Sequence, residues 1–271
     1  MSASAELFQL SGVSYSYLGR HPAVRDVDLE ITSGERVVIL GANGCGKSTM
    51  LKIMDGLLRP ESGRVVAFGE DITGAADDSA VARRLHRRVG LVFQDSDVQL
   101  FSPTVMDELL FGPLQLGVGE DEAADRAADV MRMLGIEGLK DRPSYMLSGG
   151  EKKRVAIGSV LTMSPGVLLL DEPTNGLDPK SQCFLIELII KLGEAGKTVV
   201  VSTHDLSLVS EVATRVAVLS EEHKVEKAGG TDEILSDEDM LLKVNLIHEH
   251  MHSHGQTRHK HAHSHFTFHR H

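Results

Sequence analysis

The stretch GANGCGKST, residues 41–49, decides the fold of this chain. It follows the apolar run RVVIL (36–40) and precedes the helical stretch TMLKIMDGLL (49–58). The pattern G-x-x-x-x-G-K-[ST] between a strand and a helix is that of a P-loop, which wraps the phosphates of a nucleotide. The sequence therefore predicts a phosphate-binding loop made of Gly41, Asn43, Gly44, Cys45, Gly46, Lys47, Ser48 and Thr49.

The residue types in this loop suit phosphate for separate physical reasons. Glycines allow several backbone N–H groups to turn inward, where a Cβ atom would block the approach of the phosphates. The N-terminus of the following helix adds a partial positive charge. Lys47 is predicted to reach the β- and γ-phosphates, Ser48 to ligate Mg²⁺ and Thr49 to contact the α-phosphate.

A second stretch, VLLLDEP (167–173), places two carboxylates directly after apolar strand residues. Asp171 is predicted to hold Mg²⁺, and Glu172 to polarise the attacking water as general base. An acidic turn after a strand would give the same letters, but the P-loop upstream favours the catalytic interpretation.

Short apolar runs rich in β-branched residues alternate with helical stretches along the chain. Such runs are typical of a parallel sheet that helices cover on both faces. The first 35 residues instead alternate apolar and polar side chains, which predicts an antiparallel edge sheet. From about 95 to 160 the signals are mostly helical, with Ala124, Ala127, Ala128, Met131 and Leu134 at helical spacing. The runs assigned to the central sheet are 36–40, 89–93, 167–171, 198–202 and 215–219.

The C-terminal part is expected to differ from the body. Two short helices should follow residue 230, one beginning at Thr231 and one with Ser236 and Asp239 as a capping box. Residues 248–271 show no packing pattern and are expected to be disordered. The predicted organisation is one domain over 1–230 with its helical insertion, a helical extension over 231–247, and the tail.

The charge of the chain excludes one class of partner. The formal net charge is −11 at pH 7, and residues before the tail are more acidic still because Arg258, Lys260 and Arg270 outnumber Glu249. An acidic body argues against nucleic acid as the main partner. No leader pattern and no bilayer-spanning apolar run is present, so a cytosolic location is expected. Both cysteines are expected to be free thiols.

LSGGE (147–151) indicates the family. With the P-loop before it and Asp171 about 23 residues after its serine, the chain resembles the ATP-binding-cassette ATPases over roughly residues 5–230. The resemblance implies an α/β fold, a P-loop (RecA-like) ABC nucleotide-binding domain with an N-terminal antiparallel β-subdomain and an inserted α-helical subdomain. It also implies ATP hydrolysis with Mg²⁺.

In this family the signature residues, here Ser148, Gly149 and Gly150, face the γ-phosphate bound by the other subunit. The resemblance therefore implies a head-to-tail dimer with two ATP molecules between its subunits. Asp178, at the end of NGLD (175–178), resembles the residue that reaches across that dimer.

Three further residues match the family by position. Gln94 resembles the glutamine that senses Mg²⁺ and the attacking water, and His204 the histidine that contacts the γ-phosphate. Tyr17 resembles the aromatic that stacks on adenine, with Tyr15 as its competitor. A strand-end glutamine, a core histidine and a packing tyrosine are the structural alternatives.

The stretch GLVFQDSDVQLFSPTVMDELLFGPLQLG (90–117) resembles the ATPase subunits of energy-coupling-factor transporters, although Ser96 and Val98 depart from their pattern. Glu151 in the signature is also frequent there. Cobalt and nickel uptake systems are the most similar subgroup, which implies a homodimer, or a heterodimer with a paralogue. The partners implied are a transmembrane coupling subunit and a substrate-binding membrane subunit, with this chain peripheral at the cytoplasmic face.

The same stretch offers an apolar strip for a short amphipathic helix of a basic membrane subunit, unless these residues pack inside the helical subdomain. Acidic residues at 97, 107 and 108 edge the strip. Its members are Leu100, Phe101, Pro103, Val105, Leu109 and Phe111.

The tail HEHMHSHGQTRHKHAHSHFTFHRH (248–271) holds ten of the fourteen histidines. Neutral imidazole binds Ni²⁺, Co²⁺ and Zn²⁺, and H-x-H spacing lets two rings approach one ion. The tail is interpreted as a metal reservoir or sensor, as a segment without a role, or as an artificial tag. The candidate ligands are His248, His250, His252, His254, His259, His261, His263 and His265.

The predicted function is ATP hydrolysis that powers an energy-coupling-factor importer, most directly for nickel or cobalt. The alternatives are the ATPase of an importer for a vitamin or another small substrate, and a soluble cassette ATPase without a membrane partner.

Overall fold

The computed structural model describes residues 6–254 and 257–264. Its centre is a six-stranded sheet in the order β10-β9-β3-β8-β7-β6. Five strands run parallel, and β10 (Val225–Gly230) pairs antiparallel with β9. The sequence prediction of a buried parallel sheet is therefore confirmed. The parallel strands are β3 (Arg36–Gly41), β6 (Val89–Val92), β7 (Val167–Asp171), β8 (Thr198–Thr203) and β9 (Arg215–Leu219).

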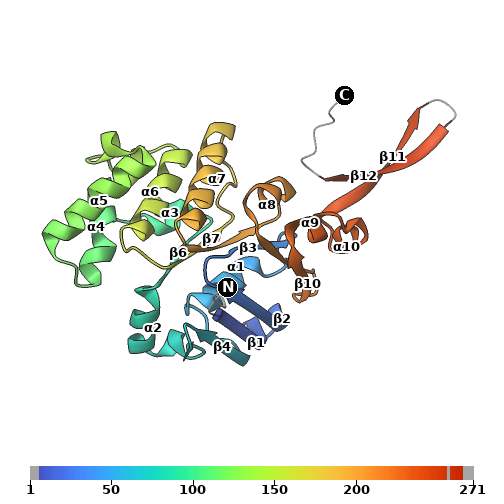
Figure 1. Cartoon of the computed structure of the whole chain (residues 1–271), viewed down its shortest axis with the longest axis horizontal. Coiled ribbons are helices and arrows are strands. Elements are labelled where there is room, and N and C mark those ends of the chain that lie inside the picture. The colour runs from blue at the N-terminus through green and yellow to red at the C-terminus, as the bar shows by residue number, and fades with distance from the viewer. Residues whose placement is uncertain (1–5, 255–256, 265–271) are drawn as a thin grey trace.

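Strand β3 divides the hydrophobic interior into two clusters because its successive side chains point to opposite faces of the sheet. Val37 and Ile39 pack with helix α1 (Lys47–Met54) and the N-terminal strands. Val38 and Leu40 pack in the cluster that includes the helices of the opposite face. Figure 1 shows α1 on one side of the sheet and α7 (Pro179–Glu194) and α8 (Leu206–Val212) on the other.

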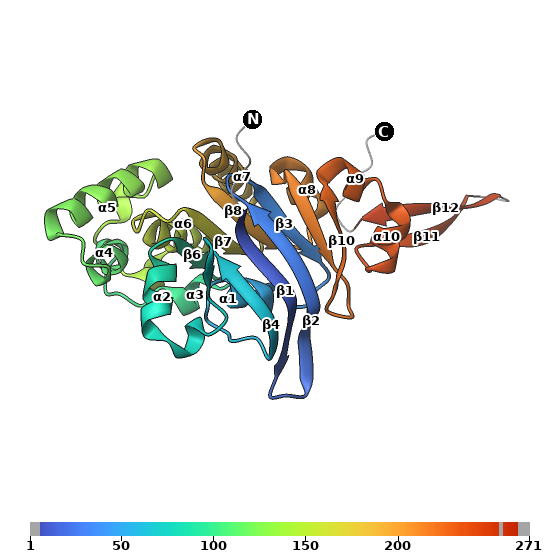
Figure 2. The same cartoon turned by 60° about the horizontal axis from the view of Figure 1, so that its bottom comes forward.

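A second, antiparallel sheet covers the α1 side of the molecule, as the alternating N-terminal pattern predicts. It has the order β2-β1-β4-β5, with β1 (Glu6–Tyr17), β2 (His21–Thr32), β4 (Ser62–Ala67) and β5 (Glu70–Asp71). Figure 2 shows β1 and β2 as the long strands of this layer. Their register pairs Tyr17 with His21, which places Tyr17 at the β1–β2 turn. The short elements η1 (Ala75–Asp77) and α2 (Ser79–His86) then lead into β6.

The helical insertion lies between β6 and β7, at one end of the molecule in both views. Its longest helix, α5, buries Ala123, Ala127 and Val130, whereas Ala124 and Ala128 are exposed. The helix predicted from the spacing of these residues is confirmed, and its buried face is formed by Ala123, Ala127, Val130, Met131 and Leu134. The elements are α3 (Ser96–Gln99), α4 (Val105–Gln115), α5 (Glu120–Leu134), η2 (Glu137–Leu139), η3 (Ser144–Met146) and α6 (Gly149–Leu161).

The C-terminal helices are α9 (Thr231–Leu235) and α10 (Glu238–Lys243). The expected capping box at Ser236 is wrong: Asp237 caps α10 by accepting a hydrogen bond from the Met240 N–H. A carboxylate one position closer to the helix takes the role because Ser236 still belongs to the end of α9. None of the helices in the described part of the chain has the length and apolar content needed to cross a bilayer.

Two strands follow α10 where the composition predicts disorder. They are β11 (Ile247–His254) and β12 (Thr257–Ser264), paired antiparallel. The alternation of histidine with other residues has the two-residue period of a strand, which explains why this segment can pair. Figure 1 shows the hairpin projecting away from the two sheets.

Candidate nucleotide-binding site

The phosphate loop lies between the end of β3 and the start of α1, and its shape depends on glycine. Gly46 caps α1 with φ of 111°, and an added Cβ would lie 1.8 Å from the backbone oxygen of Ala23. Gly44 also has a positive φ, 82°. Side chains at these two positions would be strained or would collide with β2, so the sequence prediction of a tight loop has a direct steric cause.

A cavity of about 480 Å³ opens in front of this loop. Gln94 from the end of β6 and Glu172 from the end of β7 line it together with the loop, although they lie far apart in the sequence. This convergence follows from the fold, since parallel strands place their carboxyl ends at one edge of a sheet. The lining residues are Tyr17, His21, Pro22, Ala23, Asn43, Gly44, Gly46, Lys47, Ser48, Thr49, Gln94, Glu172 and Asn175.

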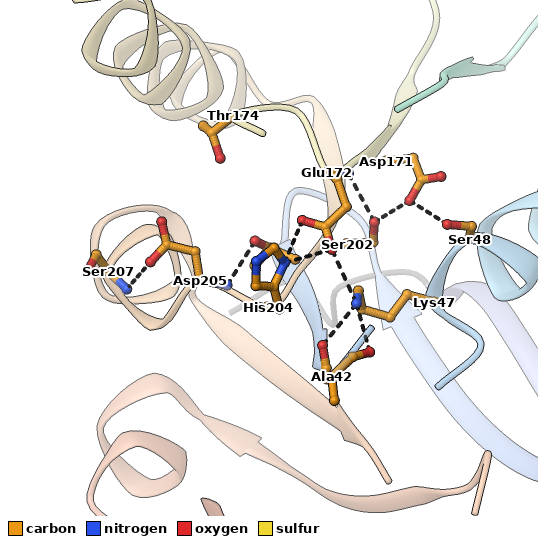
Figure 3. A network of polar contacts seen from close by, with 12 residues as sticks. Ala42, Lys47, Ser48, Asp171, Glu172, Thr174, Ser202, His204, Asp205 and Ser207 are labelled. Atoms are coloured by element: carbon orange, nitrogen blue, oxygen red, sulfur yellow. Dashed lines mark hydrogen bonds and ion pairs between the residues drawn. The ribbon is translucent and has the colours of Figure 1, made fainter. Parts of the chain in front are cut away.

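Lys47, Glu172 and the part-buried His204 form a network of polar contacts (Figure 3). The Lys47 ammonium donates to the backbone oxygens of Gly41 and Ala42 at 2.8 and 3.0 Å and lies 3.1 Å from Glu172 Oε1. His204 Nδ1 lies 3.1 Å from both carboxylate oxygens of Glu172. An incoming polyanion would compete with Glu172 for the ammonium, so this arrangement links anion binding at the loop to the state of the carboxylate.

The backbone of Glu172 is itself unusual. Its φ of 41° lies in the left-handed region, which costs a non-glycine residue on the order of 1 kcal/mol or more. The Glu172 N–H donates to Ser202 Oγ at 3.1 Å, and this bond holds the bend at the end of β7. The bend turns the Glu172 side chain toward Lys47 and His204 (Figure 3).

Asp171 and Ser48 form an oxygen-rich site beside the loop. The Ser48 hydroxyl donates to Asp171 Oδ1 at 2.9 Å, and the Ser202 hydroxyl donates to the same oxygen at 2.5 Å. Hydroxyl and carboxylate oxygens are ligands that Mg²⁺ prefers, and Mg²⁺ in phosphate sites uses few protein ligands. These two side chains therefore fit the ion that the sequence predicts.

The structure separates the two candidate aromatic residues. Tyr17 is 39% exposed, lines the cavity, and its hydroxyl lies 3.2 Å from Thr49 Oγ1. Tyr15 contacts Tyr17 edge-on, with ring centroids 5.1 Å apart, and packs against the cluster beneath the antiparallel sheet. Only Tyr17 of this pair offers ring surface to the cavity.

Cys45 contributes backbone only. Its thiol is 2% exposed and belongs to the α1-side cluster, and burial raises its pKa. The side chain thus supports the loop from behind. Sequence reasoning placed Cys45 among the phosphate-contacting positions without separating the side chain from the backbone.

Lys153 is a site residue that the sequence prediction missed. Its ammonium donates to the backbone oxygens of Phe93 at 3.1 Å and Gln94 at 2.7 Å, although the residue is only 3% exposed. Burial lowers its pKa, while the carboxylates of Asp171 and Asp95 act in the opposite direction. The signal in the sequence was a lysine at a position on the buried face of a predicted helix. Because an unpaired buried ammonium costs free energy, such a lysine is expected to donate to buried oxygens.

The signature residues lie outside this cavity. Ser148 caps α6, and Glu151 completes a capping box by accepting from the Ser148 N–H at 2.7 Å. Gly150 lies against Ser181, so close that a Cβ added to the glycine would lie 2.6 Å from the Ser181 hydroxyl oxygen. That hydroxyl donates to Asp178 at 2.7 Å. The hydrogen bonds from Ser181 lower the pKa of Asp178. The structure therefore brings the signature next to Asp178 and separates both from the chain's own phosphate loop.

The candidate metal ligands of the tail are described by backbone register alone. Three histidine pairs face each other across the hairpin: His248 with His263, His250 with His261, and His252 with His259. His254 pairs with Thr257, and His265 lies outside the described residues. Among the residues whose side chains are described, no group of three histidine, cysteine or carboxylate side chains could hold a metal ion.

Comparisons with known proteins agree with this geometry. The family model for the ABC transporter matches residues 24–175. The chain is 46% identical over 244 residues to the nickel import ATP-binding protein NikO of Rhodobacter capsulatus, covering 89% of this chain and 95% of that protein. It is 40% identical over 241 residues to the energy-coupling factor transporter ATP-binding protein EcfA of Methanothermobacter thermautotrophicus, covering 89% and 76%.

One solved structure is similar over nearly the whole chain. It is cbiO1 from Clostridium perfringens, part of the ABC transporter complex cbiONQ, with a TM-score of 0.76 and 36% identity. The match covers 89% of this chain and 95% of that one. This likeness confirms the fold predicted from the sequence.

Proposed function

Because the chain belongs to the ABC transporter family and is an ATPase that uses ATP and Mg²⁺, we propose that it powers an energy-coupling-factor importer for nickel or cobalt ions. The observation that carries the catalytic part is the single cavity that Lys47, Glu172 and Gln94 share. The similarity to a nickel import protein supports the cargo. An importer for a vitamin or another small substrate, or a soluble cassette ATPase, is the alternative.

The proposed roles at the site follow from the contacts of each side chain. Lys47 and the loop N–H groups bind the phosphates, and Tyr17 stacks on the adenine. Ser48 and Asp171 would hold Mg²⁺, to which Gln94 is proposed to respond, and the ion would neutralise charge on the phosphates. Glu172 orients the attacking water and accepts its proton, while His204 contacts both Glu172 and the γ-phosphate.

We further propose that two copies, or this chain and a paralogue, complete each other's sites. Ser148 and Gly149 are exposed at the N-terminus of α6, outside their own cavity. Backbone N–H groups at a helix N-terminus suit an anion, so the γ-phosphate held by the partner subunit is the proposed ligand. Asp178, exposed beside them, contributes to the same interface.

A groove of about 750 Å³ supports the proposed membrane partner. Phe101 and Phe111 line it and are 65% and 45% exposed, with their rings edge to face at 4.8 Å. Of the other four members of the predicted strip, Pro103 is exposed, whereas Leu100, Val105 and Leu109 are buried in the core.

Asp97 and Asp107, the acidic edge predicted to face a basic partner, are exposed, while the groove itself also carries arginines. Arg83 and Arg87 of the α2 region line one wall. Glu108 also lines the groove, but it is buried and its Oε2 accepts from the N–H groups of Phe101 and Ser102 at 3.0 and 2.8 Å. An amphipathic helix with a carboxylate facing the arginines fits this surface. Through this partner the chain would be peripheral at the cytoplasmic face of the membrane.

The histidine hairpin is proposed to bind Ni²⁺, Co²⁺ or Zn²⁺ as a reservoir or sensor. Its support is the register, which sets three histidine pairs directly opposite each other. Residues paired in an antiparallel ladder have Cβ atoms about 5 Å apart, close enough for two imidazoles to share an ion. We keep the proposed organisation of an ATPase domain over 1–230, an extension over 231–247 and a tail over 248–271.

The replacement Glu172→Gln tests the catalytic proposal. Glutamine keeps the size of the side chain but cannot accept a proton, so ATP turnover should fall by at least about tenfold while ATP-bound dimers accumulate. Phosphate release and size-exclusion chromatography with ATP measure the two effects. Glu187→Gln on the exposed side of α7 is the matched control and should behave like wild type. Undiminished turnover in Glu172→Gln would reject the assignment.

A further inference from the structure

The turn between β9 and β10 contacts the phosphate loop from behind. His223 Nδ1 lies 3.1 Å from the backbone oxygen of Cys45, inside the loop. A carbonyl oxygen can only accept, so Nδ1 carries the hydrogen and donates it. Both the neutral Nδ1–H tautomer and the imidazolium make this bond. It joins two segments that are 178 positions apart in the sequence.

His223 is itself held firmly in place. Its backbone oxygen accepts from the Arg25 N–H at 2.8 Å, and its own N–H donates to the Ser220 oxygen at 2.9 Å. These bonds tie the turn both to β2 and to the end of β9. The φ of His223 is 67°, a conformation that histidine, asparagine and aspartate adopt more readily than most other residues. The half-buried imidazole is therefore presented to Cys45 by a fixed backbone.

The bond to Cys45 constrains the neighbouring donor of the loop. In a planar trans peptide the C=O and the following N–H point in opposite directions. The oxygen of Cys45 and the N–H of Gly46 belong to one such peptide, so a bond that holds the oxygen toward His223 holds the N–H on the opposite side. Gly46 lines the cavity in front of the loop, where phosphates would lie.

We propose that His223 is a positioning residue for nucleotide binding: it fixes the Cys45–Gly46 peptide so that the Gly46 N–H is preoriented for phosphate. The inference rests on the proposed ATP site and adds a residue outside the cavity. A peptide that rotates freely must be ordered when the ligand binds, which weakens affinity. A peptide that is already held avoids that loss.

Three replacements separate the hydrogen bond from the shape of the turn. His223→Asn keeps a donor at the position of Nδ1 and tolerates the positive φ, so its KM for ATP should stay within about twofold of wild type. His223→Asp keeps the same shape without a donor, and His223→Gly tolerates the φ without a side chain. Both should raise KM about fivefold to tenfold, as expected for one lost hydrogen bond.

The maximal turnover rate should change by less than about twofold in all three variants, because a ground-state binding contact is affected. Glu222→Asn on the same turn is the control for altered charge and should match wild type. Thermal unfolding without nucleotide reports on the turn itself.

Wild-type KM in both His223→Asp and His223→Gly would overturn the inference. The inference would also be overturned if His223→Asn raised KM as much as the other two replacements and all three variants had a lowered unfolding temperature. His223 would then only maintain the shape of the turn. Absence of ATP hydrolysis in wild type would instead overturn the proposed function, and this inference with it.

Discussion

Asp55 ends the helix that follows the phosphate loop, and its side chain is 8% exposed. In the described part of the chain its Oδ1 has no hydrogen-bond partner, while Oδ2 lies 3.5 Å from His86 Nε2. The same ring nitrogen lies 2.9 Å from the backbone oxygen of Asp55. Burial raises the pKa of Asp55, and the hydrogen bond to Asp55 raises the pKa of His86.

The pair makes a pH-dependent contribution to stability. Because the pKa of His86 is higher in the folded protein, the stabilisation is full below about pH 6.5 and is lost as the pH rises through the raised pKa. We expect His86→Ala to lower the free energy of unfolding by about 1–2 kcal/mol at pH 6 and by less at pH 9. The effect is small because the His86 side chain is 37% exposed and solvent screens its charge.

Urea denaturation at the two pH values measures this difference. His86→Gln is the control, since an amide can still donate to Asp55 but does not titrate: it should be close to wild type at pH 9 and less stable than wild type at pH 6, where only histidine gains the charge-dependent part of the contact. A His86→Ala effect that is independent of pH would contradict the role of the charged pair.

At the scale of elements, α6 connects two parts of the proposed machinery. Its first turn carries the signature serine and the capping box with Glu151, whose pKa the hydrogen bonds to Ser148 lower. Less than two turns further along α6, the Lys153 ammonium donates to the backbone oxygens of Phe93 and Gln94, which follow β6. The helix therefore holds the signature and Gln94 in a fixed relation.

Replacing Lys153 by methionine should break this relation. Two backbone oxygens would lose their donor, so the free energy of unfolding should fall by about 1–3 kcal/mol. ATP turnover should fall more than the affinity for ATP, because Gln94 is proposed to act on the attacking water. Lys152→Met is the matched control, since Lys152 pairs with the exposed Asp97 at the surface. An unchanged turnover rate in Lys153→Met would contradict the connection.

The separation along the chain between contacting residues explains which features the sequence could predict. The phosphate loop, the buried strands and the carboxylates at the end of β7 depend on local patterns, and the parallel strands begin at the predicted residues and end within one residue of them. The capping box of the signature, which the sequence prediction missed, also has a local signal in its S-x-x-E spacing. Lys153 and His223 act on backbone oxygens 60 and 178 positions away, and a single sequence gives no sign of which oxygen a buried donor will meet.

At the scale of the whole molecule, the ATP site and the histidine hairpin are separate. The cavity is lined by the β1–β2 turn, the phosphate loop and the residues that follow β6 and β7. Strands β11 and β12 follow α10 and project from the rest of the molecule (Figure 2). Neither hairpin strand pairs with the central sheet. Changes in the tail should therefore affect metal binding and leave the cavity unaffected.

Deletion of residues 248–271 should remove most Ni²⁺ or Co²⁺ binding while ATP hydrolysis stays nearly intact. Isothermal titration with the metal salt measures the first, and phosphate release the second. In the full chain, metal binding should weaken below about pH 6.5 because protonated imidazole is not a ligand. Joint replacement of His259, His261 and His263 by asparagine removes one side of every cross-strand pair and should reproduce most of the loss. An unchanged metal stoichiometry after deletion would reject the reservoir.

The alternation of β3 between two clusters has a consequence for how the protein can vary. Val37 and Ile39 share neighbours with α1, and Val38 and Leu40 share neighbours with the opposite helices. Volume changes in one cluster can be compensated only within it, so substitutions on different faces should be nearly additive, while those on one face should be coupled. Apolar residues of the insertion's helices can thus vary without changing the packing of α1 behind the phosphate loop, whereas Ser148 and Lys153 of α6 cannot.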